Sequence, residues 1–490
     1  MKPIDLFDRE TEWADLERFV TSDAPGLGIG ILYGRRRLGK SFLLRRLVQE
    51  HGGIYHMAAE EEQGPALQRF VDSIAVARGL NRGDLAARDW DHALRRALAG
   101  PEVLVVIDEL PYLLASTPGT SIPSLLQHLV DEARNSSSTE TKRIILCGSA
   151  LSVMSDLLSG SKPLRGRAAL DLLLGPFDFR TTADYYGITD PHVAFQLYSI
   201  FGGVPGYRDL ISFASPQTGE ELQDVVLSTV CNPSHALFTE PAYLLREDPR
   251  VTDRALYFSI LSAIASGAST PSKIGAVIGR DARALAHPLD VLTSSGFVTR
   301  RDDLLLDRRP SLRLTDRIVQ FHDLVVAPRL SAFEDRRPHP AWEHAQPSLR
   351  TQLYGPAFED LAREWTRRHA SSETLGGEIG EIGATVVNDS QRKAQHEIDV
   401  LALAEGQRRR HPNPTIQVIG EAKDSDQPRT IGDLDRLDRV REVLEKKGLN
   451  VSRAKLILFG RNGFTPDVED RAAQRDNVEL VDLDRIRHGD

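Results

Sequence analysis

The pattern of apolar and polar positions divides the chain into segments of two kinds. Short, almost continuous apolar runs at residues 28–33, 103–107 and 143–148 are typical of parallel strands that are buried on both faces. Between them lie longer stretches whose apolar residues recur at helical spacing. This alternation predicts an α/β fold with a parallel sheet in the first part of the chain.

The middle of the chain has a pattern in which helices dominate. Residues 254–265 have helical periodicity, and Thr270 and Asp281 each stand where they can cap one further helix. Residues 297–300 and 312–314 then predict a two-stranded wing. Three helices followed by such a wing are the elements of a winged helix.

The last part of the chain returns to strands. Residues 385–387, 397–403 and 415–420 have strand patterns. An amphipathic helix is predicted before them at residues 357–365, and a second one after them at residues 431–444. These elements predict another α/β unit at the C-terminal end.

Length and local composition suggest where one unit ends and the next begins. At 490 residues the chain is too long for a single ordinary core, and residues 334–347 are rich in proline, histidine and charge, which favours a linker. We therefore expect a first α/β core at 1–185, a helical segment at 186–250, a winged helix at 251–330, a linker at 331–350 and a second α/β domain at 351–490.

Composition narrows the class of protein. Hydrophobic residues make up 41% and charged residues 27%, as in globular proteins, and the formal net charge of −9 confines any nucleic-acid surface to a local patch. Cys147 and Cys231 are too few for a disulfide framework. No targeting segment or membrane-spanning run is apparent, so we expect a cytoplasmic protein that does not associate with a membrane.

The segment after the first strand carries the most specific motif. It fits the pattern G-x-x-x-x-G-K-[ST] with Gly34, Arg35, Arg36, Arg37, Leu38, Gly39, Lys40 and Ser41. In such a loop the backbone N–H groups surround phosphates, the lysine reaches the β- and γ-oxygens, and the hydroxyl holds Mg²⁺. The sequence therefore predicts an ATP site with Lys40 and Ser41 at the phosphates.

Polar residues at the ends of the next two strands complete this site. Asp108 is expected to hold Mg²⁺ and Glu109 to polarise the attacking water. Ser149 stands where a sensor of the γ-phosphate would lie. Arg165 or Arg167 could stabilise charge on the transferred phosphoryl group, from this chain or from a neighbouring copy, although a solvated basic loop is an equal alternative.

A second group of charged residues lies in the C-terminal unit. Asp399 sits within a strand, and Glu421 and Lys423 share one face of the next strand because side chains alternate with a period of two. Two carboxylates that bind Mg²⁺ and a lysine that orients or deprotonates water are what phosphodiester hydrolysis requires. Glu359 near the start of the preceding helix adds a third acid. Solvated charges on an edge strand are the alternative.

The predicted winged helix could read DNA. The basic residues suited to that role are Arg280, Arg283 and His287 on its third helix and Arg300 and Arg301 on its wing. The alternative is a lever that packs against the ATPase core and senses its nucleotide.

Taken together, these motifs resemble the archaeal-type ATPases of the STAND branch of AAA+-related NTPases. The likeness is carried by residues 7–10 (Phe-Asp-Arg-Glu), the arginine-rich loop 34–41, the Asp108–Glu109 strand end, residues 146–149, residues 165–167 and residues 202–205. The resemblance implies a helical segment and a winged helix behind the ATPase core. It also implies that Arg9 and Glu10 lie near the adenine and that Pro205 contacts the base.

The C-terminal residues look like a PD-(D/E)XK nuclease core. In that likeness Glu359 is the helical acid, Asp399 the strand acid and residues 421–423 the E-x-K element, with Ile398 in place of the usual proline. We expect an ATPase whose nucleotide state controls a metal-dependent nuclease acting on nucleic acid, DNA rather than RNA. The alternative is a regulatory or DNA-binding ATP switch with an inactive nuclease-like module. A homo-oligomer and a protein trigger both stay open.

Overall fold

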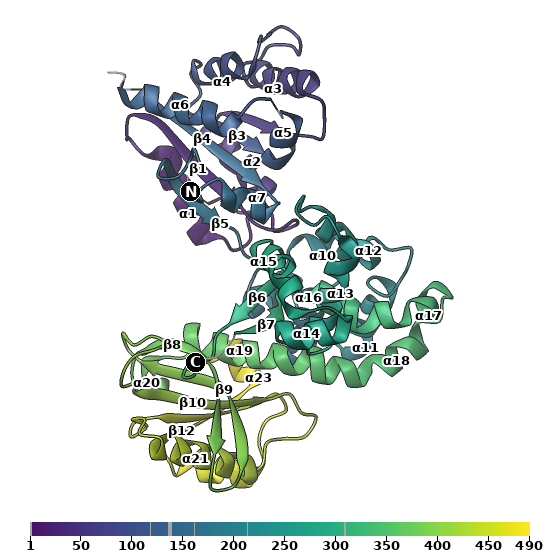
Figure 1. Cartoon of the computed structure of the whole chain (residues 1–490), viewed down its shortest axis with the longest axis vertical. Coiled ribbons are helices and arrows are strands. Elements are labelled where there is room, and N and C mark those ends of the chain that lie inside the picture. Colours follow the sequence, from purple (N-terminus) through teal and green to yellow (C-terminus); the bar gives the residue numbers. More distant parts are fainter. Residues whose placement is uncertain (1, 118, 136–139, 161, 213, 308–309) are drawn as a thin grey trace.

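The computed structural model describes residues 2–117, 119–135, 140–160, 162–212, 214–307 and 310–490. Three parts follow one another along its longest axis: an N-terminal α/β part, a helical middle and a C-terminal α/β part (Figure 1). Within the described ranges, no helix is both long and apolar enough to cross a membrane.

The N-terminal part is a five-stranded parallel sheet in the order β2-β3-β4-β1-β5. Its strands are β1 (Gly26–Tyr33), β2 (Ile54–Met57), β3 (Leu104–Asp108), β4 (Thr141–Gly148) and β5 (Ala168–Leu173). Its helices are α1 (Glu10–Thr21), α2 (Lys40–His51), α3 (Gln63–Ala77), α4 (Trp90–Leu98), α5 (Leu110–Ser116), α6 (Ile122–Asn135) and α7 (Leu151–Asp156).

Two separate apolar cores cover the two faces of this sheet. Helices α1 and α2 pack on one face, and α3 to α7 pack on the other. The predicted parallel sheet is confirmed, and its three apolar runs are the central strands. The sequence analysis did not predict the edge strands β2 and β5, because β2 has four residues and β5 alternates between more and less buried positions.

The middle of the chain is almost entirely helical. Its elements are α8 (Phe179–Tyr186), α9 (Pro191–Phe201), α10 (Gly206–Leu210), α11 (Gly219–Ser228), α12 (Ala236–Arg246), α13 (Arg254–Ala265), α14 (Pro271–Ile278), η1 (Ala282–Leu285), α15 (Ala286–Ser294), β6 (Val298–Arg301), β7 (Ser311–Leu314), α16 (Arg317–Phe321), η2 (His322–Val326), η3 (Ala327–Arg329), α17 (Leu330–Glu334), α18 (Pro338–Leu349) and η4 (Arg350–Tyr354). Strands β6 and β7 pair as an antiparallel hairpin.

The helix expected to start at Asp281 is divided in two. The Asp281 carboxylate accepts the Arg283 N–H at 2.7 Å and caps the short 3₁₀ turn η1, after which α15 begins. Pro288 lies in the first turn of α15. A proline in the first turn of a helix loses no helical hydrogen bond. In a helix that began at residue 282, Pro288 would instead interrupt the main-chain hydrogen bonds of the helix interior.

The prediction of a linker at residues 331–350 is wrong. These residues form α17 and α18, and Phe333, Trp342, Ala345 and Leu349 are buried in the core of the middle part. The proline-rich composition was misleading because Pro338 and Pro340 lie in the first turn of α18, where proline is tolerated.

The C-terminal part is a mixed sheet in the order β12-β11-β10-β9-β8, where β9 runs antiparallel to both neighbours. Its elements are α19 (Gly355–Arg368), α20 (Ser372–Leu375), β8 (Ile379–Asp389), β9 (Ala394–Ala404), β10 (Ile416–Lys423), α21 (Ile431–Lys446), β11 (Lys455–Gly460), α22 (Pro466–Ala473), β12 (Val478–Asp482) and α23 (Leu483–His488). Helices α21 and α22 cover one face. The other face shares one continuous core with α19, α23 and the helical middle.

Candidate functional site

The strand order brings the polar strand ends of the N-terminal sheet together. Strand β4 lies between β1 and β3, and all three run in the same direction. The loop after β1, the Asp108–Glu109 pair after β3 and Ser149 after β4 therefore meet at one edge of the sheet. This is the edge at which open parallel sheets bind ligands.

The loop after β1 has the backbone of a phosphate cradle. Arg37 and Gly39 have positive φ angles of 67° and 91°, and α2 begins directly at Lys40. The Lys40 side chain is buried, and its Nζ donates to the Arg35 carbonyl at 2.9 Å. Ser41 follows in the first turn of α2, where helix N–H groups and the positive helix end favour an anion.

The two acids that follow β3, Asp108 and Glu109, each accept a hydrogen bond from a hydroxyl group of another strand end or strand. Asp108 is fully buried, and one of its oxygens accepts the Tyr55 hydroxyl at 2.6 Å. Burial and the Asp108 charge raise the pKa of Tyr55, so this hydroxyl stays a donor. The Ser149 hydroxyl donates to Glu109 at 3.0 Å. Sequence reasoning did not identify Tyr55, because nothing local marks the short strand β2 as the neighbour of β3.

These observations fit bound Mg²⁺ and ATP. A left-handed glycine, a helix N-terminus and a buried lysine surround one position, and a carboxylate, a second carboxylate and a hydroxyl lie beside it. The arrangement supplies N–H and ammonium donors for phosphate oxygens and oxygen ligands for a hard cation.

The residues that the family resemblance places near the adenine lie around an aromatic cluster. Arg9 is buried, and its guanidinium stacks 4.5 Å from the centre of the Phe177 ring. The Phe177 N–H donates to the Gly203 carbonyl at 2.8 Å, two residues before Pro205. Glu10, in contrast, is exposed and hydrogen-bonds Lys2.

The three arginines of the loop turn away from its centre. Each pairs with a carboxylate of the helical middle: Arg35 with Asp316 at 2.6 Å, Arg36 with Glu247 at 3.0 Å, and Arg37 with Glu240 at 2.7 Å. The Gly206 N–H also donates to the Arg37 carbonyl at 3.0 Å. The arginine side chains of the loop thus join the ATPase part to the middle of the chain.

Neither arginine proposed to stabilise the transferred phosphoryl group is directed to the loop. Arg167 forms two hydrogen bonds with Asp131 of α6, at 3.0 and 2.9 Å. Arg165 donates to the Gly160 carbonyl at 2.6 Å. In this conformation both side chains are therefore held by hydrogen bonds to residues outside the phosphate loop.

The C-terminal acids meet across two paired strands. The Asp399 carboxylate on β9 accepts the Ala422 N–H of β10 at 2.9 Å, between Glu421 and Lys423. Burial and the nearby charges of Glu359, Glu421 and Glu397 raise the pKa of Asp399 to about 7. Crowded carboxylates of this kind are relieved by a bound cation. Lys423 is exposed at the end of β10.

Glu421 has two partners that the sequence analysis did not identify. Its Oε1 accepts Arg436 of α21 at 2.6 Å and the buried Arg429 at 3.3 Å. Burial still raises the pKa of Glu421, although both guanidinium groups oppose the shift. The helix containing Arg436 was predicted, but its contact with β10 depends on how that helix packs on the sheet.

The described residues contain no cluster of three or more His, Cys, Asp or Glu side chains that could hold a metal ion. A metal ion held by Asp399 and Glu421 would need main-chain, water or substrate oxygens as its remaining ligands. Mg²⁺ commonly binds in this way, through one or two carboxylates and a phosphate.

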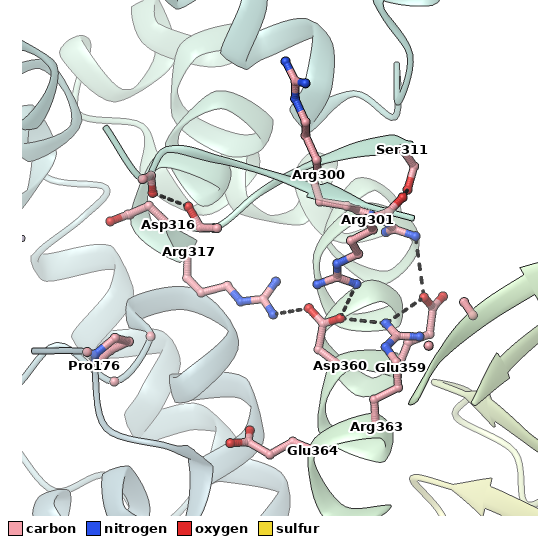
Figure 2. Close-up of a pocket in the computed structure, with 18 of the residues that line it drawn as sticks. Pro176, Arg300, Arg301, Ser311, Asp316, Arg317, Glu359, Asp360, Arg363 and Glu364 are labelled. Carbon is pink, nitrogen blue, oxygen red and sulfur yellow. Dashed lines mark hydrogen bonds and ion pairs between the residues drawn. The ribbon is translucent and has the colours of Figure 1, made fainter. Parts of the chain in front are cut away.

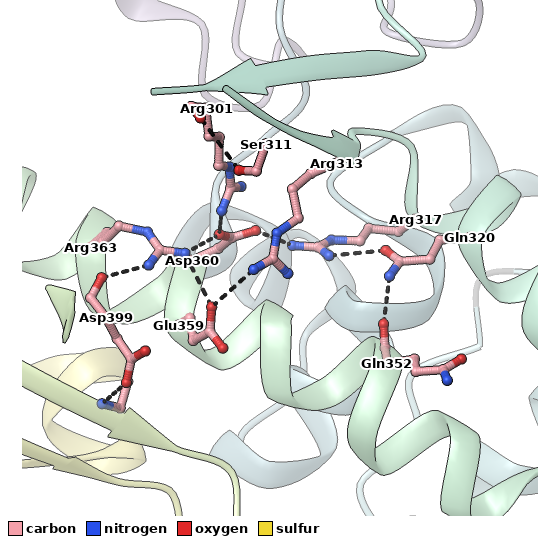
Figure 3. A network of polar contacts seen from close by, with 11 residues as sticks. Arg301, Ser311, Arg313, Arg317, Gln320, Gln352, Glu359, Asp360, Arg363 and Asp399 are labelled. Carbon is pink, nitrogen blue, oxygen red and sulfur yellow. Dashed lines mark hydrogen bonds and ion pairs between the residues drawn. The ribbon is translucent and has the colours of Figure 1, made fainter. Parts of the chain in front are cut away.

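Glu359 faces the hairpin of the middle part. It lies 3.6 Å from Arg313 on β7 and 3.7 Å from Arg363 of its own helix. Its neighbour Asp360 accepts Arg301 at 2.6 Å (Figure 3). Arg301 is therefore bound within the molecule and is not an exposed DNA-reading residue as predicted. The other basic residues proposed for that role are exposed, namely Arg280, Arg283, His287 and Arg300.

A cavity of about 1230 Å³ lies where the three parts meet. The ATPase part contributes Arg35 and Pro176 to its lining, the middle contributes Arg317, and α19 contributes Asp360 and Glu364 (Figure 2). Positively and negatively charged side chains face one another across this cavity. Residues of the phosphate loop and the α19 carboxylates of Glu359 and Asp360 thus line one shared space.

Comparison with known proteins agrees with the N-terminal geometry. Residues 6–207 match the family model described as an ATPase domain predominantly from Archaea, so this part is an archaeal-type ATPase domain. The uncharacterized protein MJECL04 of Methanocaldococcus jannaschii is 25% identical over 333 residues, which are 67% of this chain and 70% of that protein.

Two solved structures resemble part of the chain. The Walker-type ATPase Paby2304 of Pyrococcus abyssi has 20% identity and a TM-score of 0.49, covering 65% of this chain and 96% of that one. The ORC2 protein of Aeropyrum pernix has 15% identity and a TM-score of 0.43, covering 70% of this chain and 97% of that one.

Proposed function

We propose that this protein is an ATP-hydrolysing switch of the STAND type whose nucleotide state controls a Mg²⁺-dependent nuclease-like effector at its C-terminal end. The observation that carries the proposal is the double role of residues 34–41. Their backbone forms the phosphate cradle, and their arginines bind carboxylates of the helical middle. A conformational change in residues 34–41 would therefore act directly on the helical middle of the chain.

In the ATPase part each residue has a separate task. Lys40 binds the β- and γ-oxygens, and Ser41 and Asp108 hold Mg²⁺, which supplies charge neutralisation at the phosphates when bound. Glu109 accepts a proton from the attacking water, and Ser149, hydrogen-bonded to Glu109, reports the γ-phosphate. Arg9 and Pro205 border the base.

In the C-terminal part Asp399 and Glu421 bind the cation, and Lys423 orients or deprotonates water. The raised pKa of Asp399 supports this assignment, because neighbouring carboxylates that repel one another favour a divalent cation. The helices α13, α14 and α15 with the β6–β7 hairpin have the element order of a winged helix, and we assign them the role of a lever between the two sites.

The test measures ATP hydrolysis and nucleic-acid cleavage side by side in wild type, Lys40→Ala, Lys423→Ala and the control Lys447→Ala, an exposed lysine after α21. Lys40→Ala should lose both activities, Lys423→Ala only cleavage, and the control neither. Cleavage that survives Lys423→Ala refutes the nuclease role. Cleavage that is independent of ATP and of Lys40 refutes the switch.

A second function is favoured by the contacts of Glu421. Two guanidinium groups neutralise this acid and compete with a metal ion, which suits a nuclease-like module that binds nucleic acid without cutting it. Nucleic acid, DNA rather than RNA, would then meet the exposed arginines of the middle part.

Salt-dependent binding distinguishes the two functions. In the second function, duplex DNA binding weakens in Arg280→Ala/Arg283→Ala and is unaffected in Asp399→Asn. The matched control is Arg254→Ala, an exposed arginine at the start of α13. Each phosphate contact removed should reduce the slope of log affinity against log salt by about 1. An unchanged slope in the double variant refutes DNA binding by this surface.

A further inference from the structure

A path of ion pairs, with one peptide link and a final hydrogen bond to a main-chain carbonyl, joins the phosphate loop to Asp399. It starts at Arg35, whose guanidinium pairs with Asp316 at 2.6 Å, with both side chains largely buried at 17% and 9% exposure. The next residue, Arg317, reaches Asp360 of α19 at 3.0 Å (Figure 2). Two adjacent residues therefore connect parts of the chain that lie on opposite sides of the cavity.

Both carboxylate oxygens of Asp316 have a partner, so this residue links the phosphate loop to the start of α16. One oxygen binds Arg35, and the other accepts the Val319 N–H at 3.0 Å and so caps the first turn of α16. A displacement of Arg35 acts on the same carboxylate that sets the start of α16. Arg317 is the first residue of that helix, so its side chain must follow.

The path continues through α19 to the candidate metal ligand. Asp360 binds Arg301, Arg317 and Arg363, at 2.6, 3.0 and 2.7 Å (Figure 3). Although burial opposes the charged form, these three guanidinium groups hold the pKa of Asp360 well below its usual range. Arg363 also donates to the main-chain carbonyl of Asp399 at 2.6 Å.

We propose that Asp316 and Arg317 are a relay that transmits the nucleotide state of the phosphate loop to α19 and to the backbone of Asp399. The proposal rests on the proposed function and specifies how its two sites communicate. Buried ion pairs stabilise a fold no better than apolar residues of similar size, so a chain of them across a cavity is better explained by a requirement for defined, exchangeable partners. The Lys40 ammonium, which binds phosphate oxygens in loops of this kind, donates to the Arg35 main-chain carbonyl at 2.9 Å, so nucleotide binding at Lys40 acts on the residue that makes the first contact.

The experiment compares two identical chemical changes at two helix caps of the middle part. Asp316→Asn and Asp281→Asn both keep a capping side chain, because asparagine caps as well as aspartate does. Of these two aspartates, Asp316 pairs with an arginine of the phosphate loop, whereas the contact recorded for the Asp281 carboxylate is the Arg283 N–H. Hydrogen exchange of α19 and β9 is measured in the full chain, with and without Mg²⁺ and a non-hydrolysable ATP analogue.

In wild type and in Asp281→Asn, the analogue should change exchange in α19 and β9 by about fivefold or more, the lower end of typical coupling between sites. In Asp316→Asn this change should disappear while the analogue still binds. Arg317→Gln should have the same effect, and Arg317→Lys should retain part of the response. These two variants test the relay independently of the Asp316 cap.

A response in Asp316→Asn equal to that of wild type overturns the relay, as does its loss in Asp281→Asn. Analogue binding to wild type without any change in α19 or β9 also overturns it. Because exchange does not depend on cleavage, a normal response without nuclease activity refutes the nuclease half of the proposed function and supports the relay.

Discussion

The contact between Arg37 of the phosphate loop and Glu240 of α12 allows a quantitative prediction. The guanidinium donates two hydrogen bonds to the carboxylate, at 2.7 and 3.0 Å. The Glu240 side chain is 2% exposed and that of Arg37 is 23% exposed. The two partners are therefore unequal: Glu240 is enclosed by the protein, whereas Arg37 is near enough to the surface to turn outward.

This difference in burial determines the loss of stability that we expect from each substitution. Removing one partner of a buried pair costs about 3–5 kcal/mol, because the remaining charge is buried without compensation. We expect Arg37→Gln to reduce the local stability of α12 by about 3 kcal/mol. Glu240→Gln should cost about 1.5 kcal/mol, since the guanidinium becomes solvated. The coupling energy from the double-mutant cycle should be about 2 kcal/mol.

Hydrogen exchange of α12 is the appropriate assay, because a chain with several parts does not unfold in two states. A loss of about 3 kcal/mol corresponds to amide exchange that is faster by about a hundredfold. Equal effects of the two single variants would refute the reasoning from burial. Effects that add within about 0.5 kcal/mol would refute the direct interaction.

Three further predictions concern the ATPase part. Lys40→Ala should lower ATP turnover by about a hundredfold or more, as measured by phosphate release; near-normal turnover would contradict the assigned site. Tyr55→Phe, which removes the hydrogen bond to Asp108, should raise the Mg²⁺ concentration needed for half-maximal turnover by about tenfold, and an unchanged requirement would exclude a role in metal binding. Burial lowers the pKa of His56 from 6.5 to about 4, so the folded state keeps it neutral while the unfolded chain is protonated below pH 6.5. The stability that this provides is complete above pH 6.5 and is lost as the pH falls toward 4, so wild type should lose about 3 kcal/mol more than His56→Gln over that range in the free energies of opening of β2 and α3 from hydrogen exchange, and parallel curves would contradict this.

Much of the N-terminal site could be predicted because its determinants are contiguous in the chain. The phosphate loop needs glycine, lysine and serine at fixed spacing beside a strand and a helix, and all of these are local features. The acids at Asp108–Glu109 follow an apolar run that is buried on both faces, so their position at a sheet edge follows from parallel pairing. The period of two also placed Glu421 and Lys423 on one face of a strand, whereas the pairing of that strand with the one that carries Asp399 was seen only in the structure.

The partners of the charged side chains depended on the tertiary structure. Arg37 and Glu240 are separated by 203 positions, and nothing near either residue indicates the other. Arg301 was a candidate DNA-reading residue in one of two readings of the winged helix, and it binds Asp360 because the hairpin packs against α19. The proline-rich segment at 331–350 was expected to be a linker and is helical, because its apolar residues find a core supplied by other helices.

The sequence by itself determined which residues form the phosphate loop and where the three central strands of the N-terminal sheet lie, since both depend on neighbours along the chain. The tertiary structure alone decided which charges neutralise one another and hence how the two sites are connected. A guanidinium binds whichever carboxylate the packing brings within about 3 Å, and that distance is set by elements far apart in sequence.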